Sequence, residues 1–241
     1  MKRVLLALLL LLVLLTGCGG SGPTTITVFA ASSLTDVMAE LATRYGQTHR
    51  GVTVQASYGG SQELAAELKQ GQPADVLVTA DTASMDAIAR LVERRRIIAH
   101  NTMTIAVAPG NPLHVKSVAD LAGPRLRVAL GAPNTPSGRY AQELFAKAGV
   151  TVVPKSEEID VRTVLTQVRT GQADAGIVYV TDIASAGAAA ASVPVPAAQN
   201  VIATYPAAVV RKTADEDSAT TFVTWLTSPE ATAILRTYGF Q

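Results

Sequence analysis

The sequence has few residues that could form a redox or catalytic centre. It contains one cysteine and three histidines among 241 residues. One cysteine cannot form an internal disulfide. His49, His100 and His114 are widely separated along the chain, so we expect neither a metal-ligand cluster nor a histidine base. The G-x-S-x-G nucleophile motif and the glycine-rich phosphate-binding motifs are also missing. The sequence therefore predicts a protein that is not an enzyme and carries no cofactor or metal cation.

An excess of charge of one sign is also lacking. Lysine and arginine number 20 and aspartate and glutamate 19, and these charges are scattered along the chain. This argues against a nucleic-acid surface or a polybasic membrane patch. Aromatic residues make up only 5% of the chain, whereas 48% is hydrophobic, so the core must consist mostly of alanine, valine, leucine and isoleucine. The length allows one large core or two small ones.

Residues 1–17 have the pattern of a signal peptide. Lys2 and Arg3 precede an apolar run over residues 4–15, which is too short for an ordinary membrane span. The run ends in Leu-Thr-Gly-Cys at residues 15–18, which resembles the lipobox of bacterial lipoproteins. That resemblance implies cleavage before Cys18 and a lipid on its thiol. Residues 18–24 would then be a lipidated cysteine and a flexible, glycine-rich tether.

The remaining chain alternates between strand and helix patterns. Strands are predicted over residues 26–29, 51–57, 75–79, 103–108, 127–130, 150–153 and 175–180. Helices are predicted from residue 34 and over 62–69, 81–96, 117–121, 139–147, 161–170, 216–226 and 229–238. An apolar stretch over 200–211 is interrupted by Pro206. This alternation predicts an α/β fold with parallel strands covered on both faces.

An internal echo suggests that the chain is built from two similar lobes. Residues 71–81 read GQPADVLVTAD and residues 171–182 read GQADAGIVYVTD. We expect two doubly wound lobes joined by two crossover segments. The first lobe is predicted to comprise residues 25–102 and 205–241, and the second residues 103–204. Two crossings between lobes would form a hinge.

Several helix starts are candidates for binding an anion. Ser33, Ser61, Ser137 and Val161 each lie where a predicted strand leads into a helix, two in each lobe, and Tyr179 lies near the end of a strand. Open α/β sheets bind ligands at such positions. The free N–H groups and partial positive charge of a helix start can hold an oxyanion without lysine or arginine. The alternative is that the serines only cap their helices.

The motifs around these residues resemble one known family. ITVFAASSLTDVM, SYGGSQELAAEL, GQPADVLVTAD, PSGRYAQELF, EIDVRTVL, GIVYVTD and TYGF are similar to the periplasmic molybdate-binding proteins of ABC transporters, over residues 26–240. The resemblance implies a type II periplasmic-binding-protein fold. It also implies that Ser33, Ser61 and Tyr179 bind the anion together with the backbone N–H groups of Ser137 and Val161. Ser32 is the alternative to Ser33.

The resemblance implies a monomeric lipoprotein outside the cytoplasm that captures molybdate, and also tungstate, and delivers it to an ABC permease. Departures from the family pattern at Gly59-Gly60, Ser137 and Val180-Thr181 bear on selectivity. Another oxyanion such as sulfate or phosphate is the nearest alternative. An enzyme or a sensor on the same scaffold is a further one, although a cytoplasmic sensor would not carry residues 1–18.

Overall fold

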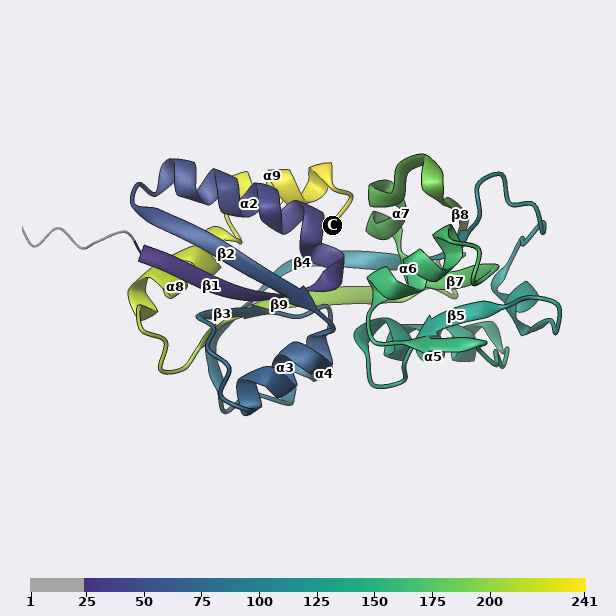
Figure 1. Cartoon of the computed structure of the whole chain (residues 1–241), viewed down its shortest axis with the longest axis horizontal. Coiled ribbons are helices and arrows are strands. Elements are labelled where there is room, and N and C mark those ends of the chain that lie inside the picture. The colour runs from purple at the N-terminus through teal and green to yellow at the C-terminus, as the bar shows by residue number, and fades with distance from the viewer. Residues whose placement is uncertain (1–23) are drawn as a thin grey trace, which may run out of the picture.

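A computed structural model describes residues 24–241, which form two lobes side by side (Figure 1). The predicted signal peptide and the predicted lipidation site Cys18 lie outside the described residues. Thr24, the last residue of the predicted tether, already belongs to the first strand. Long strands connect the two lobes, so the lobes share one continuous sheet.

The first lobe contains three parallel strands and one antiparallel neighbour. These strands are β1 (Thr24–Ala31), β2 (Val52–Gly59), β3 (Val76–Val78) and the antiparallel β9 (Ile202–Val210). Its helices are η2 (Ser32–Leu34), α2 (Thr35–Thr48), α3 (Ser61–Lys69), α4 (Thr82–Asp86), α8 (Glu216–Trp225) and α9 (Pro229–Thr237). In Figure 1, α2, α8 and α9 lie on one side of this part of the sheet and α3 and α4 on the other.

The second lobe repeats this plan. Its parallel strands are β5 (Val128–Gly131), β6 (Ser156–Glu158) and β7 (Ala175–Tyr179), and β8 (Ala191–Pro194) pairs with the connecting strand β4 (Val92–Val107). Its helical segments are η3 (Val118–Ala122), α5 (Pro136–Ala148), α6 (Val161–Arg169), α7 (Val180–Ala186) and η4 (Gly187–Ala189). A helix thus follows each of β5, β6 and β7, as a helix follows each of β1, β2 and β3.

The strand order is β2-β1-β3-β9-β4-β7-β5-β6. The sheet is mixed, because β9 runs antiparallel to β3 and β4, and β4 runs antiparallel to β7. This corrects the prediction of a parallel sheet. Within each lobe the three strands that precede helices remain parallel. The two echo segments contain β3 and β7, which take matching places, each between a parallel strand and an antiparallel one.

The crossover between the lobes lies in the middle of β4. This strand pairs with β9 as far as Thr102 and with β7 from Met103 onward. Because β9 begins at Ile202, opposite Thr102, the second crossover lies beside the first. The precise domain boundaries stay a prediction.

The predicted helical stripes pack as expected. In α2 the buried residues are Val37, Met38, Leu41 and Tyr45, and in α6 they are Val161, Val164, Leu165 and Val168. This spacing places one apolar face of each helix against the sheet. Gly71 and Gly171 have φ angles of +88° and +71°, the left-handed conformation that ends the helices before them.

The predicted helix over residues 81–96 is wrong. Only Thr82–Asp86 is helical, and residues from Val92 onward form the start of β4. Pairing with β9 decides the outcome, since Val92 lies opposite Val210 and Arg96 opposite Ala207. A local helical pattern was outweighed by the long-range pairing of a strand.

Two further predictions also need correction. The predicted strand over 150–153 is a loop in which Val153 is 84% exposed, and the strand that pairs with β5 begins instead at Ser156. Pro206 does not interrupt β9, because it lies where the β4–β9 register shifts between Ile97 and Ala99. A proline that cannot donate to the ladder is tolerated at such an irregularity.

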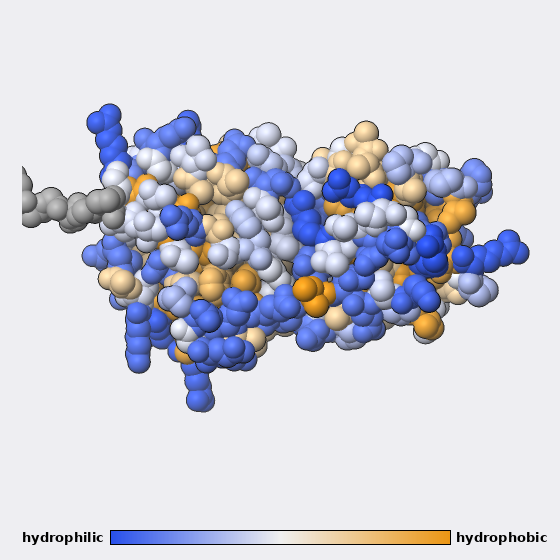
Figure 2. Space-filling model, viewed as in Figure 1, coloured by the Kyte–Doolittle hydropathy of each residue, from blue (hydrophilic) through white to orange (hydrophobic). Residues whose placement is uncertain are grey.

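The surface of the molecule is mainly hydrophilic on the face shown in Figure 2, with apolar residues in small scattered groups. Within residues 24–241, no helix combines the length and the apolar character that a membrane crossing requires.

Candidate functional site

A small cavity lies between the two lobes, and all five predicted site residues line it. Ser33 and Ser61 come from the first lobe, and Ser137, Val161 and Tyr179 from the second. The other residues of the lining are Ala31, Ser32, Gly59, Gly60, Ala80, Thr135, Pro136 and Asp160. The structure therefore brings the five residues together. That they bind a ligand stays a prediction.

The two serines of the first lobe are both held through the oxygen of their hydroxyl group. Ser33 lies in η2, and its Oγ is 3.1 Å from the Oη of Tyr205 on β9. Ser61 is the first residue of α3, and its Oγ accepts a hydrogen bond of 3.0 Å from the N–H of Ala80. When Tyr205 donates to Ser33, each serine keeps its own proton available for a ligand in the cavity. Ser32 also lines the cavity, so the choice between Ser32 and Ser33 stays open.

The second lobe contributes two helix starts. Thr135 caps α5 by accepting from the N–H of Gly138, and Asp160 caps α6 by accepting from the N–H groups of Arg162 and Thr163. Neither cap takes the N–H of the predicted donors Ser137 and Val161, which lie in the first helical turn where no helical carbonyl is available. Two backbone donors, each at the positive end of a helix dipole, therefore lie at the cavity.

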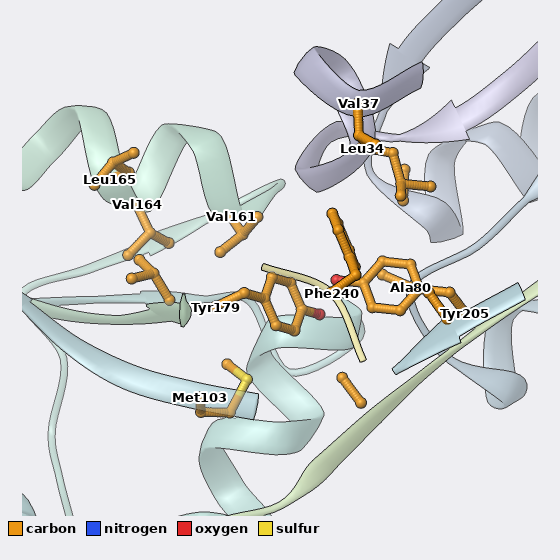
Figure 3. Packing of buried hydrophobic residues seen from close by; sticks show 14 of the residues in the cluster. Leu34, Val37, Ala80, Met103, Val161, Val164, Leu165, Tyr179, Tyr205 and Phe240 are labelled. Carbon is orange, nitrogen blue, oxygen red and sulfur yellow. The ribbon is translucent and has the colours of Figure 1, made fainter. Parts of the chain in front are cut away.

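Tyr179 is the last residue of β7 and lines the cavity. Its side chain is buried, and its Oη has no hydrogen-bond partner within the described residues. Burial raises the pKa of Tyr179 well above its usual value, so the phenol is neutral and can donate. In Figure 3 the rings of Tyr179, Phe240 and Tyr205 lie together between the helices of the two lobes. The ring centroids of Tyr179 and Tyr205 are 5.9 Å apart.

No lysine or arginine lines the cavity within the described residues. The one charged side chain in the lining, Asp160, already accepts hydrogen bonds from Arg162 N, Thr163 N and Thr163 Oγ1 at 2.7, 3.0 and 3.1 Å. The hydroxyl and backbone groups aimed at the cavity are therefore uncharged donors. This set of groups can hold an anion whose oxygens only accept hydrogen bonds.

A second layer of residues was missed by the sequence reasoning. Tyr205 belongs to an apolar stretch 172 positions from Ser33, and nothing local in the sequence indicates that their hydroxyl groups meet. Arg139 and Arg162 are better signalled, because each closely follows a predicted backbone donor at a helix start. Both arginines instead pair with carboxylates of the first lobe.

A buried carboxylate contacts the backbone of Tyr179. Asp182, in the first turn of α7, is fully buried and accepts a hydrogen bond of 3.0 Å from the N–H of Tyr179. Arg162 Nε lies 3.1 Å from Asp182 Oδ1, close enough for an ion pair but without hydrogen-bond alignment. Burial raises the pKa of Asp182 to about 7, against the opposing effect of Arg162.

The histidines stay apart in the structure. His49 ends α2 and stacks on Tyr45, whereas His100 lies on β4 beside Thr204. In the part of the chain that the structure describes, no three histidine, cysteine or acidic side chains gather to hold a metal ion.

Comparisons with known proteins agree with this architecture. The family model described as a bacterial extracellular solute-binding protein matches residues 26–241. The chain is 37% identical to the molybdate-binding protein ModA of Mycobacterium tuberculosis over 240 residues, which cover 94% of this chain and 92% of that protein.

Two solved structures share the fold over 90% of this chain. The periplasmic molybdate-binding protein of Azotobacter vinelandii has a TM-score of 0.78, with 24% identity and 98% of its own chain covered. The sulfate-binding protein SubI of Mycobacterium tuberculosis has a TM-score of 0.77, with 22% identity and 86% covered. The match to the family model spans nearly the whole described chain, and the chain therefore belongs to the bacterial extracellular solute-binding protein family.

Proposed function

We propose that the protein captures molybdate, and also tungstate, in the cavity between its lobes and delivers it to the permease of an ABC transporter. The observation that carries this proposal is the convergence of uncharged donors from both lobes on one small cavity. The 37% identity to a molybdate-binding protein supports the choice of anion. The proposed ligand groups are the side chains of Ser33, Ser61 and Tyr179 and the backbone N–H groups of Ser137 and Val161.

The five proposed donors supply a large part of the binding free energy that the proposal requires. A hydrogen bond to a charged group contributes about 1.5–3 kcal/mol. Sub-micromolar affinity requires roughly 8–12 kcal/mol net. Five such donors give about 7.5–15 kcal/mol before desolvation of the anion and ordering of the lobes are subtracted, so further backbone N–H groups at the same helix starts would have to contribute. Because the donors come from both lobes, an open molecule cannot use them all at once, and ligand binding favours closure.

The donor set also ranks the alternative anions. An oxyanion that carries a proton must donate a hydrogen bond. Asp160, the one carboxylate among the described lining residues, already accepts three hydrogen bonds and has about one acceptor position left. Hydrogen phosphate is therefore expected to be a poorer ligand than a fully deprotonated anion. Sulfate is fully deprotonated and only accepts hydrogen bonds, so sulfate is the second candidate.

We further propose that the protein acts outside the cytoplasm as a monomer and is held at the membrane by a lipid on Cys18. The signal-peptide pattern and the Leu-Thr-Gly-Cys sequence at residues 15–18 support this location. The first lobe is proposed to comprise residues 25–102 and 205–241 and the second residues 103–204. The proposed hinge lies where the paired strands β4 and β9 pass from one lobe to the other.

Isothermal titration calorimetry of the purified protein with molybdate, tungstate, sulfate and phosphate tests the function. The proposal predicts dissociation constants below about 1 µM for molybdate and tungstate. Sulfate is expected to bind at least about a hundredfold more weakly and phosphate not measurably. Tighter binding of sulfate than of molybdate would make the second candidate correct, and no heat with any of the four anions would contradict both.

A further inference from the structure

Two arginines of the second lobe reach across the cleft beside the proposed anion donors. Arg139 lies two residues after Ser137 on α5, and its Nε donates to Asp81 Oδ2 of the first lobe at 2.7 Å. Arg162 directly follows Val161 on α6, and its Nη2 donates to Asp36 Oδ2 of the first lobe at 2.8 Å. Both guanidinium groups are thus bound to carboxylates of the opposite lobe.

Asp81 is fixed at its own end. It lies at the N-cap of α4, where its Oδ1 accepts a hydrogen bond of 2.9 Å from Ser84 N, and its side chain is 6% exposed. The Oγ of Ser84 accepts a further bond of 2.9 Å from Arg139 Nη2. The carboxylate of the Asp81–Arg139 pair is therefore shielded from water, whereas the side chain of Arg139 is 32% exposed, so salt screens the pair only in part.

Arg162 also contacts two residues of its own lobe. Its Nη1 donates to Ser185 Oγ at 2.8 Å, and its Nε lies 3.1 Å from the buried Asp182. Its partner Asp36 lies in the first turn of α2, three residues after Ser33, and is 45% exposed. This pair is more open to water and is expected to be the weaker of the two.

Resting on the proposed function, we propose that Asp81–Arg139 and Asp36–Arg162 form a clasp that holds the lobes closed and slows escape of the bound anion. The arginines do not bind the anion, because neither lines the cavity and their nitrogen atoms already donate to other groups. Arg139 donates to Asp81, Ser84 and the carbonyl oxygen of Asn134, and Arg162 to Asp36 and Ser185. Opening the cleft must separate both pairs. The clasp therefore acts mainly on the dissociation rate. In the ligand-free protein it also holds part of the molecules closed, so its loss leaves association unchanged or up to about twofold faster.

Stopped-flow measurement of molybdate dissociation from Asp81→Asn, Asp36→Asn and the double variant tests the clasp. Asparagine keeps the size of aspartate and can still cap α4, so the fold is retained. The matched control is Asp174→Asn, because Asp174 pairs with Arg127 at 2.6 Å within the second lobe alone. We expect dissociation to be about tenfold faster in Asp81→Asn and about threefold faster in Asp36→Asn, with association within about twofold of wild type. The control should match wild type.

Small-angle scattering of the ligand-free proteins separates this proposal from the proposed function. Loss of the clasp should increase the radius of gyration of the double variant relative to wild type and to the control. If wild type binds none of the anions, the proposed function fails, and scattering alone then decides on the clasp. Unchanged dissociation together with unchanged size in the double variant would overturn the proposal. Equally fast dissociation in Asp174→Asn would overturn it as well.

Discussion

At the scale of single residues, the orientation of hydroxyl groups decides what the cavity can bind. A hydroxyl group has one proton to donate. The oxygen of Ser61 already accepts from Ala80 N, and that of Ser33 lies 3.1 Å from Tyr205 Oη. With their oxygens engaged in this way, both serines can direct their protons into the cavity. The arrangement favours anions that only accept hydrogen bonds.

Ser33→Ala and Ser61→Ala are each expected to weaken molybdate binding by roughly 1–3 kcal/mol, since each removes a hydrogen bond to a charged ligand. Calorimetry of each variant measures the loss. Ser192→Ala, on the exposed part of β8, is the matched control and should bind as wild type does. Full affinity in both cavity variants would remove the two serines from the proposed site.

Tyr179→Phe should separate binding from stability. The Oη of Tyr179 is buried without a partner in the described structure, and an unsatisfied buried hydroxyl costs about 1–3 kcal/mol. The variant should therefore bind molybdate more weakly but unfold, without ligand, at an equal or higher denaturant concentration. Tyr205→Phe is the comparison, because it loses its contact with Ser33 and should be no more stable than wild type. Unchanged affinity in Tyr179→Phe would remove Tyr179 from the proposed site.

The raised pKa of Asp182 leads to a specific dependence of the free energy of unfolding on pH. Burial raises its pKa to about 7, so between about pH 4 and 7 the folded protein holds a proton that the unfolded chain has lost. The contribution of Asp182 to the free energy of unfolding is then full below pH 4 and declines as the pH rises towards 7. Urea unfolding at several pH values should show this decline in wild type relative to Asp182→Asn. Parallel curves for the two proteins would contradict the shifted pKa.

At the scale of elements, local patterns predicted helices that follow strands better than they predicted the strands between lobes. The stripe Val37, Met38, Leu41 and Tyr45 identified α2, because each residue faces the sheet at helical spacing. The segment after Asp81 was misassigned because its strand character depends on pairing with β9, more than a hundred residues later. The local sequence pattern indicates which face of an element is buried, but it does not indicate which distant strand the element pairs with.

The candidate site was predictable to a similar degree. Ser33, Ser61, Ser137 and Val161 could be found because helix starts have a local signature. Contacts such as Tyr205 with Ser33, or Asp81 with Arg139, join residues that only the folded sheet brings together. The supporting layer of the site therefore required the structure.

The corner between β2 and α3 gives a test at this scale. Gly60 has an ordinary φ of −64°, yet a Cβ there would lie 2.5 Å from the carbonyl oxygen of Ile159 in the other lobe. Gly60→Ala should therefore fold normally but close incompletely, with molybdate affinity lowered about tenfold or more. Gly59→Ala is the control, since its Cβ would meet only Leu64 at ordinary distances of 3.4 and 3.6 Å. Similar affinities for the two variants would contradict this account of closure.

At the scale of the whole molecule, the lobes meet through contacts on more than one side of the cavity. Gln62 Nε2 donates to Ile159 O at 2.8 Å, and the two arginine–aspartate pairs lie beside the helix starts of α5 and α6. These contacts belong to the closed arrangement, in which the donors of both lobes converge on one cavity. The charged side chains therefore form ion pairs between the lobes, whereas the donors that line the cavity are uncharged.

A crystal structure of the molybdate complex tests this division of roles most directly. The account predicts anion oxygens within hydrogen-bond distance of Ser33 Oγ, Ser61 Oγ, Tyr179 Oη and the backbone nitrogens of Ser137 and Val161, with Arg139 and Arg162 still paired to Asp81 and Asp36. An anion bound by either guanidinium group, or one bound away from these five residues, would contradict it.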